Sequence, residues 1–216
     1  MEITFVGHSC FKIKGKQLSL VIDPYDPKIG YKLPKLEADV IMVTHNHYDH
    51  ANTAGVAGSR FLINGPGEYE ISGALINGLQ TFHDEKNGAK RGSNTVYLID
   101  IDDFTILHLG DLGHELSDST LENIGAVDVL MIPVGGNYTI DAEVAAKVIS
   151  SIEPSIVIPM HYRTSEATSP KDIDPLDKFL DEMGVRENVK RMDKLKISSK
   201  SDVPSETEIV VLTPAH

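Results

Sequence analysis

The chain has 216 residues, and 41% of them are hydrophobic, so a sizeable core can form in one large domain or two small ones. Its formal net charge is -12, which makes nucleic acid an unexpected partner, because an acidic chain is a poor match for a phosphate backbone. The only cysteine, Cys10, excludes a disulfide framework and a metal site built on several thiolates.

The predicted strands of the first half are short and joined by turns. Apolar or alternating runs predict strands at residues 3–6, 10–13, 18–22, 40–43, 60–63, 74–82, 95–101 and 104–109. Asp102 and Asp103 form the expected tight hairpin turn before the last of these.

The second half alternates helices with strands. We expect helices at 117–124, 141–152 and 175–183, and strands at 129–134, 155–160 and 208–212. Thr139 or Asp141 is the expected cap of the second helix. Many strands with interspersed helices predict an α/β fold with two mixed sheets covered by helices on their outer faces, in a single domain spanning 1–216.

No stretch approaches the roughly 20 apolar residues that a membrane span needs, so no membrane partner is expected. The first residues lack the basic and apolar regions of a secretion signal, and a cytoplasmic location is therefore expected. A small molecule is the expected substrate, and association of identical copies is compatible with the sequence.

The segment THNHYDH at 44–50 is the most informative stretch, because it follows an apolar strand at once. His45 and His47 are two apart in an extended segment, so both imidazoles face one side and can bind one metal ion. Asp49 and His50 can converge on a second ion where the backbone bends. Each ion then needs ligands from elsewhere. Nitrogen and carboxylate ligands without thiolate suit zinc, manganese and iron alike, and zinc is the metal we expect, with manganese and iron as alternatives.

The pattern H-x-H-x-D-H after a strand resembles the metallo-β-lactamase superfamily. That resemblance implies a four-layer αβ/βα sandwich and further ligands, which match His83 in LQTFHDEKNG, Asp111 in LHLGDLGH and His161 in IVIPMHYRT. The early aspartate of the family matches Asp23 in LVIDPY. The segments GHSCFKI, GDLGH, PVGGNYTIDAEVAA and IPMHY also resemble a compact branch with L-ascorbate-6-phosphate lactonase-like hydrolases.

The resemblance implies two divalent metal ions. One is held by His45, His47 and His83, and the other by Asp49, His50 and His161, with Asp111 as the bridge. It implies a dinuclear hydrolase in which a metal-bound hydroxide attacks a small, anionic ester, lactone or phosphoester. Asp49 and Asp111 are then also the candidate catalytic residues for proton transfer to the leaving group.

Three alternative functions remain open at this point. A nuclease or phosphodiesterase of this fold usually carries an additional domain or arm for the polymer. An iron-dependent oxidoreductase of this fold either adds a flavin domain or uses a single iron. A non-catalytic metal-binding protein is disfavoured because every expected ligand is present.

Four other polar residues are candidates for positioning a ligand or binding substrate. Asp23 follows a strand and can orient a ligand histidine, or it can cap a turn. The family resemblance places His8 near the metals and a polar residue at Asn94, and His114 lies three residues beyond Asp111.

Two further residues, His108 and Cys10, are expected in the core. The loop 83–94 is a polar segment whose Lys86, Lys90 and Arg91 either contact an anionic substrate or are solvated. The segment VGGNYT, 134–139, is either an anion-binding turn or a turn that simply requires glycine.

Overall fold

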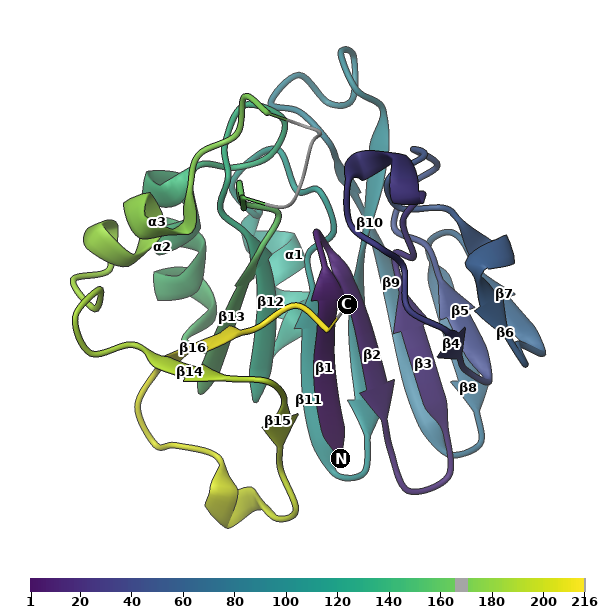
Figure 1. The fold of residues 1–216 in the computed structure, drawn as a ribbon. Helices are drawn as coiled ribbons and strands as arrows, with labels where there is room; N and C mark the ends of the chain where they lie inside the picture. The colour runs from purple at the N-terminus through teal and green to yellow at the C-terminus, as the bar shows by residue number, and fades with distance from the viewer. Residues whose placement is uncertain (166–170, 216) are drawn as a thin grey trace.

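The computed structural model describes residues 1–165 and 171–215, and its core lies between two mixed β-sheets (Figure 1). The six-stranded sheet has the order β15 (Leu195–Lys196), β1 (Glu2–Gly7), β2 (Cys10–Lys14), β3 (Ser19–Ile22), β5 (Val40–Met42) and β7 (Phe61–Ile63). Alternate residues of its strands, such as Phe5, Leu20 and Met42, face the second sheet. This is the period of two that the apolar pattern predicts.

The larger sheet has eight strands, in the order β14 (Lys190–Met192), β16 (Glu208–Leu212), β13 (Ile156–Met160), β12 (Val129–Pro133), β11 (Phe104–His108), β10 (Ser93–Ile101), β9 (Ala74–Phe82) and β8 (Gly67–Ile71). The first five strands are parallel, and β11 to β8 form an antiparallel meander. The parallel strands β12 and β13 are buried at every position, as strands covered on both faces must be.

Three α-helices connect the parallel strands, namely α1 (Asp118–Ile124), α2 (Ala142–Ile152) and α3 (Leu176–Glu182). Since crossovers between parallel strands are right-handed and these run in one direction along the sheet, the helices cover its same outer face (Figure 1). Asp141 caps α2 by accepting from the Val144 N–H at 3.0 Å, which settles the choice between Thr139 and Asp141.

The outer face of the six-stranded sheet has a different cover. Val21 and Ile41 on that face pack against Tyr25, Ile29 and Tyr31, which belong to an irregular segment after β3. This segment contains the 3₁₀ helix η1 (Pro27–Ile29) and a small parallel pair, β4 (Leu36–Glu37) with β6 (Val56–Ala57). The two-sheet α/β sandwich is therefore confirmed, and in the described residues all three α-helices lie against the larger sheet.

All of the predicted strands and helices are present, with small shifts at their ends; β10, for example, begins at Ser93 rather than at residue 95. The strands β4, β6, β8, β14 and β15 were missed, because they are short or, like Lys190–Met192, lack an apolar pattern. Two further 3₁₀ helices are η2 (Thr53–Gly55) and η3 (Lys200–Asp202). Within the described part of the chain, every helix falls short of the length and apolarity needed to cross a bilayer.

Candidate metal centre

The candidate ligands all follow strands that run toward one edge of the sandwich. In the smaller sheet β1, β3 and β5 share a direction, and in the larger sheet β9, β11 and β13 do so. The residues after these strands are His8 after β1, Asp23 after β3, 45–50 after β5, His83 after β9, Asp111 after β11 and His161 after β13. The carboxyl ends of six strands thus supply one site.

The side chains at this edge form three groups with metal-ligand spacing among the described residues, and within each group the potential ligand atoms lie within 4.8 Å of one another. Two of the groups share no residue, and they are His45, His47 and His83, and His8, Asp49, His50 and His161. The third, His45, His50 and Asp111, takes one histidine from each of them. The first group contains the three histidines predicted for one ion. The second contains the three predicted ligands of the other ion and adds His8.

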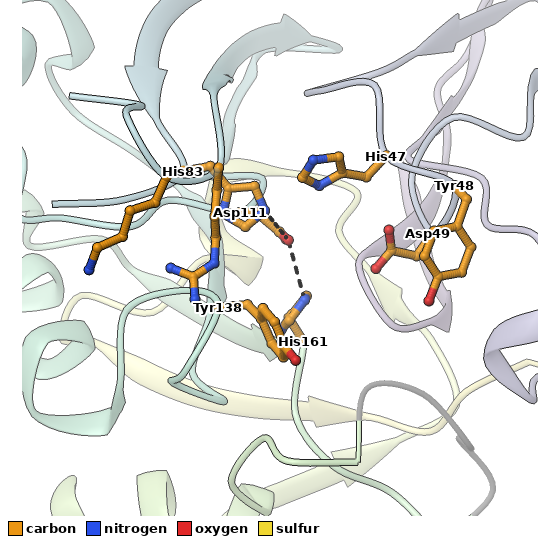
Figure 2. Close-up of a pocket in the computed structure, with 9 residues that line it drawn as sticks. His47, Tyr48, Asp49, His83, Asp111, Tyr138 and His161 are labelled. Atoms are coloured by element: carbon orange, nitrogen blue, oxygen red, sulfur yellow. Dashed lines mark ion pairs between the residues drawn. The ribbon is translucent and has the colours of Figure 1, made fainter. Parts of the chain in front are cut away.

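Asp111 lies between the two groups. Its Oδ2 atom is 3.2 Å from His83 Nε2 and 3.8 Å from His45 Nε2, and it is 3.3 Å from Nε2 of both His50 and His161. Figure 2 shows this carboxylate between His83 and His161, with His47 and Asp49 facing it from the opposite side. One carboxylate oxygen therefore contacts ligand candidates of both groups.

Several polar atoms at this point are buried without a hydrogen-bond partner among the described residues. They include Nε2 of His45, Nε2 of His50 and Oδ1 of Asp111. Burying an unpaired polar atom costs about 1–3 kcal/mol, so a fold rarely retains several converging ones without a ligand. Imidazole nitrogens and carboxylate oxygens at this spacing are the donors that divalent transition metals bind. The residues fit such ions.

The electrostatics of the histidines agrees with this fit. Burial lowers the pKa of His45 to about 3 and that of His8 to about 4, so both imidazoles are neutral and hold a lone pair at pH 7. Burial also lowers the pKa of His50, but Asp111 and Asp23 outweigh it and raise the value well above normal. Because two carboxylates contact the His50 imidazole, this part of the site stabilises positive charge.

The carboxylates are ionised despite their burial. Burial alone would raise the pKa of Asp111, but His161 and His50 hold it well below its usual value. Burial likewise raises the pKa of Asp49, and the contact with His8 and the nearby His50 outweigh this and lower it. Both acids can therefore bind cations at neutral pH.

Asp23 contacts His50 directly, as the sequence suggested. Its Oδ2 lies 2.9 Å from His50 Nδ1, which leaves Nε2 of that ring directed at Asp111. The same carboxylate accepts from the Thr44 N–H at 2.8 Å and from the Thr44 hydroxyl at 2.7 Å, and the Thr44 hydroxyl lies 3.0 Å from His45 Nδ1. Asp23 and Thr44 thus orient two ligand candidates. Sequence reasoning missed Thr44, whose only signal is its place before His45.

Asn94 and His114 contact the backbone beside ligand candidates. The buried Asn94 accepts from the Asp111 N–H at 3.0 Å and donates to the Leu109 carbonyl at 2.9 Å, so it holds the turn that carries Asp111. His114 Nε2 accepts from the Phe82 N–H at 3.2 Å and does not line the cavity at the site. His114 thus contacts the backbone next to His83.

A cavity of about 440 Å³ opens over the metal groups. Its wall includes Lys90 and Arg91 from the 83–94 loop, and also Tyr48 and Tyr138, which sequence reasoning did not single out. Tyr48 stands between His47 and Asp49 in the sequence, so its place beside two ligand candidates could have marked it as a site residue. Tyr138 lies in the VGGNYT turn, far from the ligand candidates in the sequence. Lys86 from the same loop does not line this cavity.

His108, Cys10 and the glycine turn at 134–139 have structural surroundings. His108 and Cys10 are both fully buried, so their placement in the core is confirmed. A Cβ atom at Gly135 would lie 2.1 Å from the His161 carbonyl oxygen. This close approach is a structural reason for glycine in the 134–139 turn.

Residues 2–161 match the β-lactamase superfamily domain, and the chain belongs to that superfamily. This confirms the resemblance seen in the ligand motifs. A metal-dependent hydrolase of the family UPF0173 from Thermoplasma volcanium is 33% identical over 193 residues, covering 76% of this chain and 84% of that relative. A relative with the same description from Thermococcus kodakarensis is 30% identical with similar coverage. The chain is thus a member of this family of metal-dependent hydrolases.

Solved structures show the same fold. A protein from Thermotoga maritima, assigned as a Zn-dependent hydrolase of the metallo-β-lactamase superfamily, superposes with a TM-score of 0.79 at 33% identity and covers 98% of this chain and 97% of its own. A metallo hydrolase from Ignicoccus hospitalis has a TM-score of 0.67 at 20% identity, covering 100% of this chain and 96% of its own.

Proposed function

We propose that this protein is a dinuclear metal-dependent hydrolase that cleaves a small, anionic ester, lactone or phosphoester in the cytoplasm. The position of Asp111 carries the proposal. Its single Oδ2 atom is within 3.8 Å of four imidazole nitrogens drawn from two separate groups. A carboxylate so placed is suited to bridge two cations, whereas a mononuclear site requires only one of the groups.

We assign the first ion to His45, His47 and His83, and the second to Asp49, His50 and His161. His8 is within reach of the second ion, because its Nε2 is 3.3 Å from Asp49 Oδ2 and its ring centroid is 4.3 Å from that of His161. Zinc is the metal we propose, with manganese and iron as alternatives, because nitrogen and carboxylate donors without thiolate suit all three.

Two divalent ions at these positions would polarise the bond to be broken and lower the pKa of a coordinated water toward about 7. The chain's own residues have separate tasks. Asp23 holds His50 in one orientation through the 2.9 Å contact. Asp49, which lines the cavity, and Asp111 are the candidates for carrying a proton to the leaving group, in addition to holding the ions.

The size of the cavity supports a small substrate. At about 440 Å³ it falls in the range of roughly 300–1,000 Å³ that is typical of sites for small molecules. A polymer such as RNA would need an extended basic surface, and the chain carries a net charge of -12. We therefore favour small esters, lactones and phosphoesters over nucleic acid.

The test is substitution of Asp111 by alanine. Asp111→Ala should lose at least one metal ion per chain and most of the hydrolytic activity, because the bridge contacts both groups. Metals per chain are measured by elemental analysis, and turnover is measured on ester, lactone, thioester and phosphodiester panels with added zinc or manganese.

Asp100→Ala is the matched control, because this exposed strand residue contacts only Thr105 through its carboxylate in the described structure. It should retain wild-type metal content and turnover. Wild-type metal content together with wild-type turnover in Asp111→Ala would refute the assignment.

A further inference from the structure

The loop between β9 and β10 is built around one carboxylate, that of Asp84. Its Oδ1 accepts from the N–H groups of Lys86 at 2.7 Å and Gly88 at 3.1 Å. Its Oδ2 accepts from Lys90 at 2.9 Å and Arg91 at 2.7 Å. Since Asp84 directly follows the ligand candidate His83, these four bonds hold the loop at a defined position beside the metal groups.

The side chain of Arg91 has a second contact, with Tyr138, which also lines the cavity. Its guanidinium carbon lies 5.3 Å from the ring centroid of Tyr138, within the distance of a cation–π contact. The Tyr138 hydroxyl donates to Asp172 Oδ2 at 3.0 Å, and the Asn137 amide donates to the same oxygen at 2.7 Å. A cation–π contact uses none of the guanidinium N–H groups as hydrogen-bond donors to oxygen, so they stay available for an anion.

Lys90 and Arg91, which form the cationic wall of the cavity, have no strong ion pair with a carboxylate among the described residues. No carboxylate of the described residues forms an ion pair with Arg91, whereas Lys90 lies 3.4 Å from Glu85. That pair joins two exposed side chains, and such pairs contribute little to stability. Lys90 can therefore turn to a bound anion at small cost.

The negative groups of the cavity are already assigned. The carboxylates among its described lining residues are Asp49 and Asp111, and both belong to the metal site. Lys90 and Arg91 therefore make one wall positive, in a protein whose formal net charge is -12. An arginine fork matches carboxylate and phosphate oxygens in a bidentate arrangement.

We propose that Arg91, assisted by Lys90, binds an oxyanion of the substrate that is separate from the bond being cleaved. The substrate class is then an ester, lactone or phosphoester that carries an additional carboxylate or phosphate group. This inference rests on the proposed function for the identity of the reacting bond. The anion contact itself is a property of the loop.

The test measures equilibrium binding of two simple oxyanions, inorganic phosphate and acetate, to the protein with its metal content determined. Arg91→Gln should weaken the binding of at least one of them by about tenfold or more, because it removes a charged hydrogen-bonding partner. Lys90→Gln should have a smaller effect in the same direction. The anion that responds to Arg91→Gln identifies the group as phosphate or carboxylate.

Lys86→Gln is the matched control. It removes the same charge from the same loop, but Lys86 does not line the cavity, so binding should change by less than about twofold. Equal effects of Arg91→Gln and Lys86→Gln, or no effect of either, would overturn the proposal and leave both side chains as solvated loop cations. Unchanged metal content in each variant shows that the effect does not arise from metal loss.

The two proposals fail in different ways. If wild-type protein binds two metals and hydrolyses an ester while Arg91→Gln binds both anions normally, the anion site is wrong and the hydrolase stands. If the wild type holds no metal and cleaves nothing, the hydrolase is wrong, yet a selective loss of phosphate or acetate binding in Arg91→Gln still supports the anion site.

Discussion

Three residues of the site adopt left-handed backbone conformations that non-glycine residues rarely occupy. The φ angles are 57° at His8, 50° at Asp23 and 51° at His161. Each residue directly follows the end of a strand and turns its side chain into the site. Such conformations cost of order 1–3 kcal/mol each and persist where the surroundings require them. The His161 N–H also donates to the His8 carbonyl at 2.8 Å, so two of these residues hold each other.

His108 differs from the other histidines of the region, because both ring nitrogens are engaged by the backbone. Nδ1 accepts from the Gly110 N–H at 3.1 Å, so the proton must be on Nε2, which donates to the Ser9 carbonyl at 3.0 Å. Burial lowers its pKa, and its ring packs on Phe11. These contacts define a structural residue.

We predict that His108→Phe destabilises the fold by about 2–4 kcal/mol, because it keeps a ring against Phe11 but leaves two buried backbone groups unpaired. Turnover of the folded fraction should be unchanged. In urea denaturation the wild type should lose stability as the pH falls below about 6.5, since the unfolded chain then binds the proton more readily. His108→Phe should show less of this loss. A stably folded variant without turnover would contradict the structural role.

At the scale of elements, the ends of strands place the functional side chains, and the turns that follow them must let these ends approach closely. The turn between β12 and α2 passes directly over His161. Gly135 is required there, because any Cβ would lie 2.1 Å from the His161 carbonyl oxygen. The same turn continues to Tyr138, which packs on Arg91. One turn thus connects the metal site with the cationic wall.

We predict that Gly135→Ala costs about 1–3 kcal/mol or more of stability and weakens metal binding, because the strand end that carries His161 must shift. Gly65→Ala is the matched control, since nothing lies within 4 Å of its added Cβ and its backbone is unstrained. Denaturant titration and metal titration of both variants provide the measurements. Equal metal affinity in the two variants would show that the turn does not position His161.

At the scale of the whole molecule, both sheets contribute to each proposed ion. His45 and His47 come from the smaller sheet and His83 from the larger one, while His50 of the smaller sheet faces His161 of the larger. Hydrogen bonds also join the two edges here, among them the Thr95 N–H to the Thr44 carbonyl at 2.9 Å and the Tyr97 hydroxyl to the Val43 carbonyl at 2.8 Å. Bound metal would add further links between the sheets, because its ligands come from both.

We predict that a chelator lowers the melting temperature. When the free metal concentration is 100 times the Kd, binding at one site adds about 2.7 kcal/mol to the free energy of unfolding. For a chain of this size that raises the melting temperature by roughly 5–11 °C. Calorimetry with chelator and with added zinc or manganese measures this shift. It should also show one cooperative transition, as expected of a single domain. Identical melting temperatures under all of these conditions would argue against metal binding by the folded state.

Features that depend on neighbouring residues could be predicted from the sequence of this protein. The helices and the longer apolar strands follow from apolar periodicity, and Asp141 caps α2 as its residue type allows. His45 and His47 share a face because residues two apart in extended chain always do. Their convergence with His83, Asp111 and His161 came only from resemblance to a family, since no local rule relates residues so far apart.

The tertiary structure decided which distant residues meet. Parallel strands in two sheets end at one edge, and this arrangement places His8 in the second metal group and Thr44 against Asp23. It also distinguishes Lys86 from Arg91, two cations of one loop, because Arg91 lines the cavity and lies near the Tyr138 ring, whereas Lys86 does not line the cavity. Sequence by itself determined the kinds of ligand and their local geometry, because these depend on neighbouring residues. Strand order and loop packing determined the site, because they bring together parts of the chain that are far apart.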